Sequence, residues 1–164
     1  MATPTTLPAA FVAGNVLEAS QLNNLRGAFR VLQVVAATYS TQVASSSATL
    51  ADTGLTATIT PSATSSKVLV YVSQNGVGKV NNANAVIKLL RGASVINTLD
   101  ESAAYTNSAA DNRIGSVSGM YLDTPATTSA TTYKTQFSSA LGNASVYVQL
   151  GGSTSSIVLM EISA

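Results

Sequence analysis

Apolar and polar residues alternate with a period of two along most of the chain after residue 30. In GLTATITP, Leu55, Ala57 and Ile59 fall on one side of a predicted strand and threonines on the other, and Pro61 ends it. KVLVYVSQ alternates in the same way but has apolar residues on both sides, which predicts a strand in the interior of a sheet. AVIKLLRGASVINTL predicts a hairpin that turns at its Gly-Ala pair.

Further segments with strand character are RVLQVVAATYS, IGSVSGMYLD, TTYKTQFSS, ASVYVQLGG and SSIVLMEIS. Together these segments make about eight to ten short strands separated by turn signals, which is typical of an antiparallel sandwich or barrel. The sequence therefore predicts a mainly β fold, an antiparallel jelly-roll-like β-sandwich over residues 31–164. A parallel β-solenoid is the alternative, but the chain has no fixed repeat period to support it.

The first thirty residues follow a different pattern. Two prolines within residues 1–10 predict an extended arm. Apolar residues at helical spacing predict a short amphipathic helix over residues 16–29, and such a helix is unstable without a cover for its apolar side. Residues 1–30 are therefore expected to form an arm and a docking helix. The positions expected to serve attachment or trimerisation are Phe11, Val16, Leu17, Leu22, Leu25 and Phe29.

Charge narrows the classes of function. Only 9% of the residues are charged and the net charge is +1, whereas about 25% is typical. A chain with this balance has no field that would attract nucleic acid, and it has no apolar run of the roughly 18 residues that a membrane helix needs. We expect neither nucleic-acid binding nor membrane insertion. So little charge also indicates that much of the surface is buried against copies of the chain or a partner.

The sequence offers little catalytic chemistry. It contains no His and no Cys, which removes the common Ser/His and Cys/His nucleophile systems and the common zinc sites. We expect no enzymatic activity and no cofactor. Asp100 and Glu101 are expected to be solvated, with a hard-cation site that they share with Asp111 as the alternative. SQNGVGKV lacks the residues of a phosphate-binding loop, because Ser73 and Val80 stand at its outer positions.

Two long polar segments, GVGKVNNANA and DESAAYTNSAADNR, are expected to be irregular and to lie at one end of the sandwich. Tyr105 lies in the second segment with Asn107 and Asp111, where its ring could stack on a sugar. These three residues form a candidate receptor loop. The absence of Trp argues against strong sugar stacking.

The segment FVAGNVLEASQLNNL resembles a pattern near the start of many bacteriophage tail-fibre and other virion appendage proteins, roughly F-x-x-G-x-x-L-T-A-x-x-L-N-x-L. The matching residues are Phe11, Gly14, Leu17, Ala19, Leu22, Asn23 and Leu25. Glu18 replaces the threonine of the pattern, and Asn15 is the alternative helix cap. The segments YSTQVASSSATLADTGLTATITPSATSSKVLVYV, IKLLRG, YLDTPATTSATTYKTQF and IVLMEI are similar to the β domains of phage virion proteins.

This resemblance implies a virion structural protein made in the host cytoplasm, a homotrimer that contacts other virion proteins and has no enzymatic activity. The first reading is a tail-fibre-type appendage held by its N-terminal segment. A capsid decoration (cement) protein is an alternative that the same arm and helix would suit. A carbohydrate-binding module that recognises a host-surface glycan is another.

Overall fold

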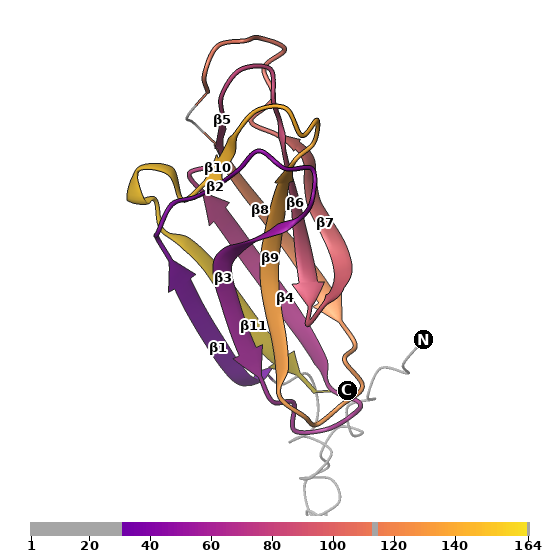
Figure 1. Ribbon diagram of the computed structural model, residues 1–164. Coiled ribbons are helices and arrows are strands. Elements are labelled where there is room, and N and C mark those ends of the chain that lie inside the picture. The colour runs from indigo at the N-terminus through magenta and orange to yellow at the C-terminus, as the bar shows by residue number, and fades with distance from the viewer. Residues whose placement is uncertain (1–30, 113–114, 164) are drawn as a thin grey trace, which may run out of the picture.

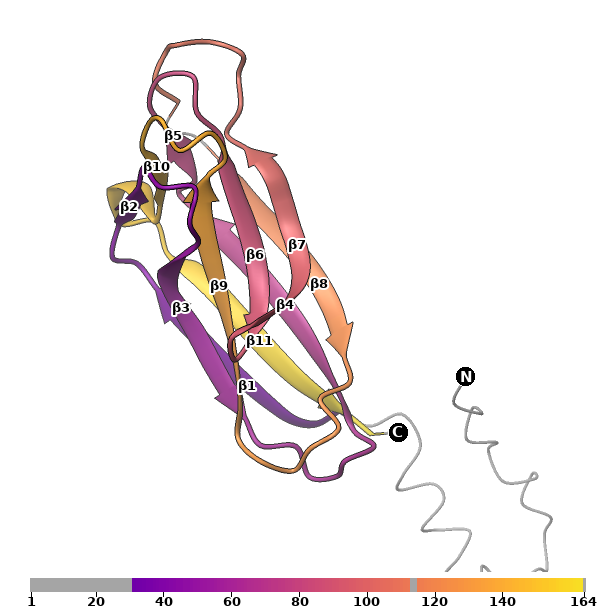
Figure 2. The same cartoon turned by 45° about the vertical axis from the view of Figure 1, so that its right-hand side comes forward.

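The computed structural model describes residues 31–112 and 115–163. Over these residues the chain is mainly β and forms two four-stranded antiparallel sheets that pack face to face, with a small three-stranded sheet at one end (Figures 1 and 2). The predicted antiparallel β-sandwich is confirmed at this level, and the antiparallel pairing rules out the parallel solenoid. The arm and the helix expected within residues 1–30 lie outside the described residues.

Eleven strands make up the described part of the chain. The first sheet has the strand order β1 (Val31–Tyr39), β11 (Ser155–Ile162), β4 (Lys67–Asn75) and β8 (Ser116–Asp123). The second sheet has the order β3 (Ala51–Ile59), β9 (Thr131–Ser139), β6 (Ala85–Arg91) and β7 (Ser94–Ala103). The small sheet has the order β2 (Val43–Ser45), β10 (Val146–Val148) and β5 (Gly78–Lys79), and a 3-10 turn covers Leu150–Gly152.

Periodicity located the long strands correctly. The apolar side of β3 is buried as expected, and β4 lies between β11 and β8 in the interior of its sheet. The predicted hairpin is also confirmed, because Arg91 pairs with Ser94 and Gly92 takes the turn at a φ of 58°. One boundary was wrong: β7 runs on to Ala103, so Asp100 and Glu101 belong to a strand rather than a loop. The short strands β2 and β5 were also missed, since three and two residues are too few to show a period.

The interior contains two apolar clusters. The first consists of Leu55, Ala57, Ile59, Val68, Val70, Val72, Leu89, Tyr133, Ile157 and Leu159. The second consists of Val77, Ala83, Ala85, Ile87, Ala103, Val117, Phe137, Val146 and Val148. Each of the two four-stranded sheets contributes to both clusters, so the sandwich has a core of its own along its whole length.

A buried row of polar side chains connects the two sheets where the clusters meet. Thr53 and Thr135 of the second sheet share a hydrogen bond of 2.6 Å between their hydroxyl oxygens. Thr135 donates to Gln74 Oε1 in the first sheet at 2.9 Å, and Gln74 donates to Ser155 Oγ at 3.0 Å. All four side chains are fully enclosed. Because a buried polar group without a partner is costly, this row favours one alignment of the sheets over others.

Candidate functional site

The two ends of the sandwich differ in what they carry. Val31 begins β1 and pairs with Ile162 at the end of β11, so residues 1–30 join the domain at the end where the last strand finishes. We call this the junction end. The loops that follow β5 and β7 lie together at the opposite end, which we call the loop end (Figure 1). The expected placement of the two long polar segments at one end is therefore observed.

Lys79 holds the loop end together. Its side chain is 1% exposed, and its ammonium group donates hydrogen bonds to the carbonyl oxygens of Asn81 at 2.7 Å, Ser108 at 2.6 Å and Ala110 at 3.0 Å. An ammonium group has three donors and no acceptor, so three carbonyls satisfy it fully. The backbone adds a second connection, because Lys79 and Asn112 exchange both of their N–H···O bonds, at 2.7 and 3.0 Å.

Sequence reasoning missed Lys79. In the sequence this lysine stands in an incomplete phosphate-loop pattern, which gives it no role. The available signal was a lone lysine within the largely apolar and glycine-containing run GVGKV, in a chain with only eight Lys and Arg residues. A lysine in such a setting is buried only when backbone or side-chain acceptors surround it.

The Lys79 contacts fix the loop that carries the candidate receptor residues. Tyr105 donates from its hydroxyl group to Asn107 Oδ1 at 3.0 Å, and its side chain is 49% exposed. Asn107 has a φ of 50°, a conformation that asparagine tolerates better than most residues. Asp111 instead accepts a hydrogen bond from the backbone N–H of Asn81 at 3.3 Å. The structure thus brings Tyr105 and Asn107 together and places Asp111 against the neighbouring loop.

The carboxylates of the alternative cation site have separate partners in the structure. Asp100 accepts a hydrogen bond from the backbone N–H of Ser102 at 2.7 Å, and Glu101 pairs with Lys88 at 3.3 Å. Residues 31–112 and 115–163 contain no group of three or more acidic, His or Cys residues placed to hold a metal ion. Each of the two neighbouring carboxylates therefore has its own local partner, and neither joins Asp111.

Polar networks around two buried carboxylates, Glu161 and Asp123, secure the junction end. Glu161 accepts hydrogen bonds from Gln33 Nε2 at 2.6 Å and from both the backbone N–H and the hydroxyl group of Ser62, at 2.7 and 2.6 Å. Burial raises the pKa of Glu161, but the hydrogen bonds from Ser62 and Gln33 outweigh it and lower the pKa to about 2. The carboxylate is thus charged at neutral pH. It fixes the beginning of β1 to β11 and to the connection between β3 and β4.

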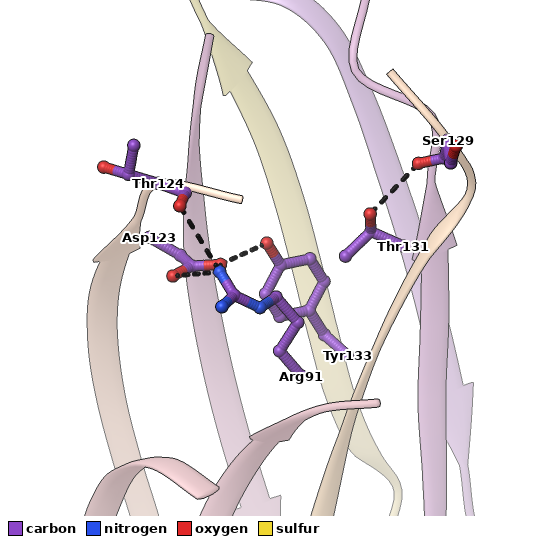
Figure 3. A network of polar contacts seen from close by, with 6 residues as sticks. All are labelled: Arg91, Asp123, Thr124, Ser129, Thr131 and Tyr133. Carbon is purple, nitrogen blue, oxygen red and sulfur yellow. Dashed lines mark hydrogen bonds and ion pairs between the residues drawn. The ribbon is translucent and has the colours of Figure 1, made fainter. Parts of the chain in front are cut away.

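A second network at this end joins the two sheets. Arg91 of β6 and Tyr133 of β9 converge on Asp123 of β8 (Figure 3). The Arg91 guanidinium donates to both carboxylate oxygens at 3.0 and 2.9 Å, and the Tyr133 hydroxyl group donates to Oδ2 at 2.7 Å. Burial, followed by the hydrogen bond to Asp123, raises the pKa of Tyr133. The tyrosine therefore stays a neutral donor, and the carboxylate has its charge compensated.

A hollow of about 220 Å³ lies on the second sheet, between β3 and β9. Its charged groups already satisfy one another, because Lys134 pairs with Asp52 at 2.7 Å and Gln136 donates to the same carboxylate at 2.8 Å. Gly54, at a φ of 86°, lines the hollow, and a Cβ atom there would lie 2.3 Å from the Tyr39 ring. The glycine is thus explained by close packing rather than by a ligand.

The residues expected to serve attachment lie outside the described part of the chain. They are Phe11, Val16, Leu17, Leu22, Leu25 and Phe29. Within the described ranges, the structure contains no helix with the length and apolar character of a membrane span. Neither the protein-family models nor the curated proteins contain a match to the sequence.

Proposed function

We propose that this chain is a bacteriophage virion structural protein, a homotrimeric tail-fibre-type appendage attached through residues 1–30. The observation that carries the proposal is the polarity of the domain. The segment that resembles virion appendage proteins enters at the junction end, and the Lys79-supported loops lie at the far end. An appendage needs this arrangement, with one end that is held by the particle and another that faces outward.

The junction end is suited to bear a load. Gln33 lies only two residues into β1, and its amide donates to Glu161 and to the carbonyl oxygen of Thr60, at 2.6 and 2.7 Å. A pulling force applied at Val31 is therefore transmitted to β11 and to the end of β3 through the side chain of Gln33. The Arg91–Asp123 pair then connects the first sheet to the second. The Glu161 and Asp123 carboxylates are buried, so separating either one from its partners would leave a buried charge without hydrogen bonds.

We further propose that the sandwich is a jelly roll. Taken in chain order, its eight long strands lie in the first, second, first, second, second, first, second and first sheet. This repeated crossing between two four-stranded sheets supports an eight-strand jelly roll, which is made of two Greek keys. Jelly rolls are common in viral proteins, but a fold of this kind does not by itself decide a function.

Recognition of a host-surface glycan is a second candidate function, and Tyr105 is the observation that favours it. The Tyr105 ring is half exposed at the loop end, and the hydrogen bond from Lys79 to the carbonyl oxygen of Ser108 holds the loop that carries it. An aromatic ring on a rigid support can stack on a sugar without a large ordering cost. Tyr105→Ala should abolish glycan binding, whereas Tyr105→Phe should keep the stacking. Equal binding by the Ala variant and the wild type would exclude this role.

Labelled particles would test the main proposal. One epitope is inserted after Asn107 at the loop end, and a second is fused to the C-terminus near the junction end. In electron micrographs of the phage, both labels should lie on a tail appendage, with the loop label farther from the particle. Labels spread over the capsid would instead support a decoration protein, and particles without label would refute a virion role. Insertion variants must first retain the wild-type circular dichroism spectrum.

A further inference from the structure

The outward side of the first sheet is apolar across all four strands. Inward residues such as Val70 and Leu159 are buried in the core, so their strand neighbours point outward. These outward residues align in two rows. One row is Val34, Met160, Leu69 and Leu122, and the other is Ala36, Val158, Tyr71 and Met120. We call these eight residues the apolar face.

The apolar face is open in the single chain. Met120 is 67% exposed, Val34 57% and Leu122 49%. The next row along the sheet consists of the small polar residues Thr38, Ser156, Ser73 and Ser118. An apolar centre with a polar margin is the usual composition of a protein interface. A contiguous exposed apolar patch on a soluble domain commonly marks such an interface.

The outer side of the second sheet is different in character. It carries the ion pairs Lys134–Asp52 and Lys88–Glu101, and the exposed Thr58 and Thr132 share a hydrogen bond of 2.8 Å. The two apolar rows contain no charged residue. Since both sheets come from the same low-charge chain, composition alone does not explain this contrast. Only one of the two outer sides is suited to lose its contact with water.

We propose that the apolar face is the surface through which copies of this chain associate, with the same face of each copy turned toward a common symmetry axis. The inference rests on the homotrimer of the proposed function and deepens it by naming the contact surface. A neutral face offers a charged partner nothing to recognise, but it is compatible with itself. Homo-oligomers with closed symmetry are also the commonest soluble assemblies.

The outer side of the first sheet is large enough for this role when the apolar face is taken together with the polar residues beside it. Four strands about 4.8 Å apart and eight residues long give this whole side roughly 19 by 27 Å, or a projected area of roughly 500 Å², of which the two apolar rows cover about half. The accessible area of the pleated side chains is larger, and each partner in a standard interface contributes about 800 Å².

The test compares the full-length wild type with Met120→Lys and Leu122→Lys by light scattering on a sizing column. Val95→Lys is the matched control, because Val95 is 47% exposed on β7 in the second sheet. We expect the mass of three chains for the wild type and the control. Either lysine in the apolar face should weaken self-association at least about 100-fold, since an unpaired charge would be buried in every copy. Raising the salt concentration should not dissociate the wild type.

Oxidation of Met120 by peroxide, read by peptide mass spectrometry, gives a second measurement that does not depend on a variant. We expect Met120 to react much more slowly in the wild type than in the Leu122→Lys variant. A wild-type trimer that survives both lysine substitutions, or in which Met120 reacts quickly, would overturn the assigned surface but leave the trimer standing. A wild-type monomer would overturn both. A monomer with protected Met120 would assign the face to a segment of the same chain.

Discussion

Replacing Lys79 with methionine tests whether this buried lysine supports the loop end. Methionine has a similar length and no donors, so Lys79→Met keeps the apolar part of the side chain and removes all three hydrogen bonds to Asn81, Ser108 and Ala110. A hydrogen bond to a charged group contributes about 1.5–3 kcal/mol, so three would amount to roughly 5–9 kcal/mol without offsets.

Two offsets reduce that figure. The variant no longer buries an ammonium group, which costs several kcal/mol in the wild type. The freed carbonyls also belong to surface loops, so they can bind water once the loops separate. We therefore expect a net loss of about 2–4 kcal/mol in the free energy of unfolding, or a Tm lower by about 5–15 °C. Most of the change should be local, because the first apolar cluster lies wholly within the two four-stranded sheets and neither cluster includes Lys79.

Urea unfolding and hydrogen exchange together provide the assay. The amide of Asn112, which donates to Lys79 O at 3.0 Å, should exchange far faster in the variant, while amides of β4 and β11 should change only by the global loss. Lys134→Met is the control, since it removes a half-exposed surface ion pair worth about 0–1 kcal/mol. The reasoning fails if Lys79→Met and Lys134→Met have equal stability, or if the Asn112 amide remains as protected as in the wild type.

Three further predictions follow from other parts of the chain. Thr135→Val should lower the free energy of unfolding by about 1–2 kcal/mol, because it leaves the buried amide oxygen of Gln74 without its donor. Thr132→Val, on the outer side of the same strand, should change the free energy of unfolding by less than about 0.5 kcal/mol. Urea unfolding measures both, and equal effects would contradict the role of the buried polar row. The pKa of Glu161 is about 2 in the folded chain, against 4.5 for an unperturbed glutamate. The contribution of this group to the free energy of unfolding is therefore complete above about pH 4.5 and is lost as the pH falls toward 2. Acid titration should show this fall in stability for the wild type and not for Glu161→Gln. The double variant Leu22→Ala, Leu25→Ala should sharply reduce incorporation of the protein into particles, because each truncated leucine costs the docking contact about 2–5 kcal/mol. The thermal unfolding of the β domain should stay unchanged. Normal incorporation would show that this segment is not the anchor.

The sequence determined the class of fold and most of the long strands because side chains in a strand alternate between two environments. Leu55, Ala57 and Ile59 showed this alternation directly, and their burial in β3 confirms it. The hairpin at Gly92 was equally local, since a two-residue turn with glycine at its first position needs no tertiary information. The low charge content predicted that part of the surface is buried against copies of the chain or a partner. It did not predict which residues form that surface, because a composition does not say where residues lie.

Only the tertiary structure decided which strands are neighbours in a sheet, and therefore which outward-pointing residues of different strands lie side by side on one sheet face. Met120 and Leu122 alternate with less exposed residues in β8, and Thr56 and Thr58 alternate with buried residues in β3, so each strand alone predicts one inner and one outer side. The apolar face exists because pairing aligns Leu122 with residues of three strands that are distant in sequence.

The candidate site shows the same division. The polar segment around Tyr105 could be recognised as an exposed loop from its residues, since an exposed loop is a local property. The support that Lys79 gives it depends on contacts across 29 and 31 positions of sequence, to the carbonyls of Ser108 and Ala110. Backbone carbonyls carry no signature in the sequence, because every residue has one. The acceptors of a buried lysine are therefore defined only when the fold brings the two loops together.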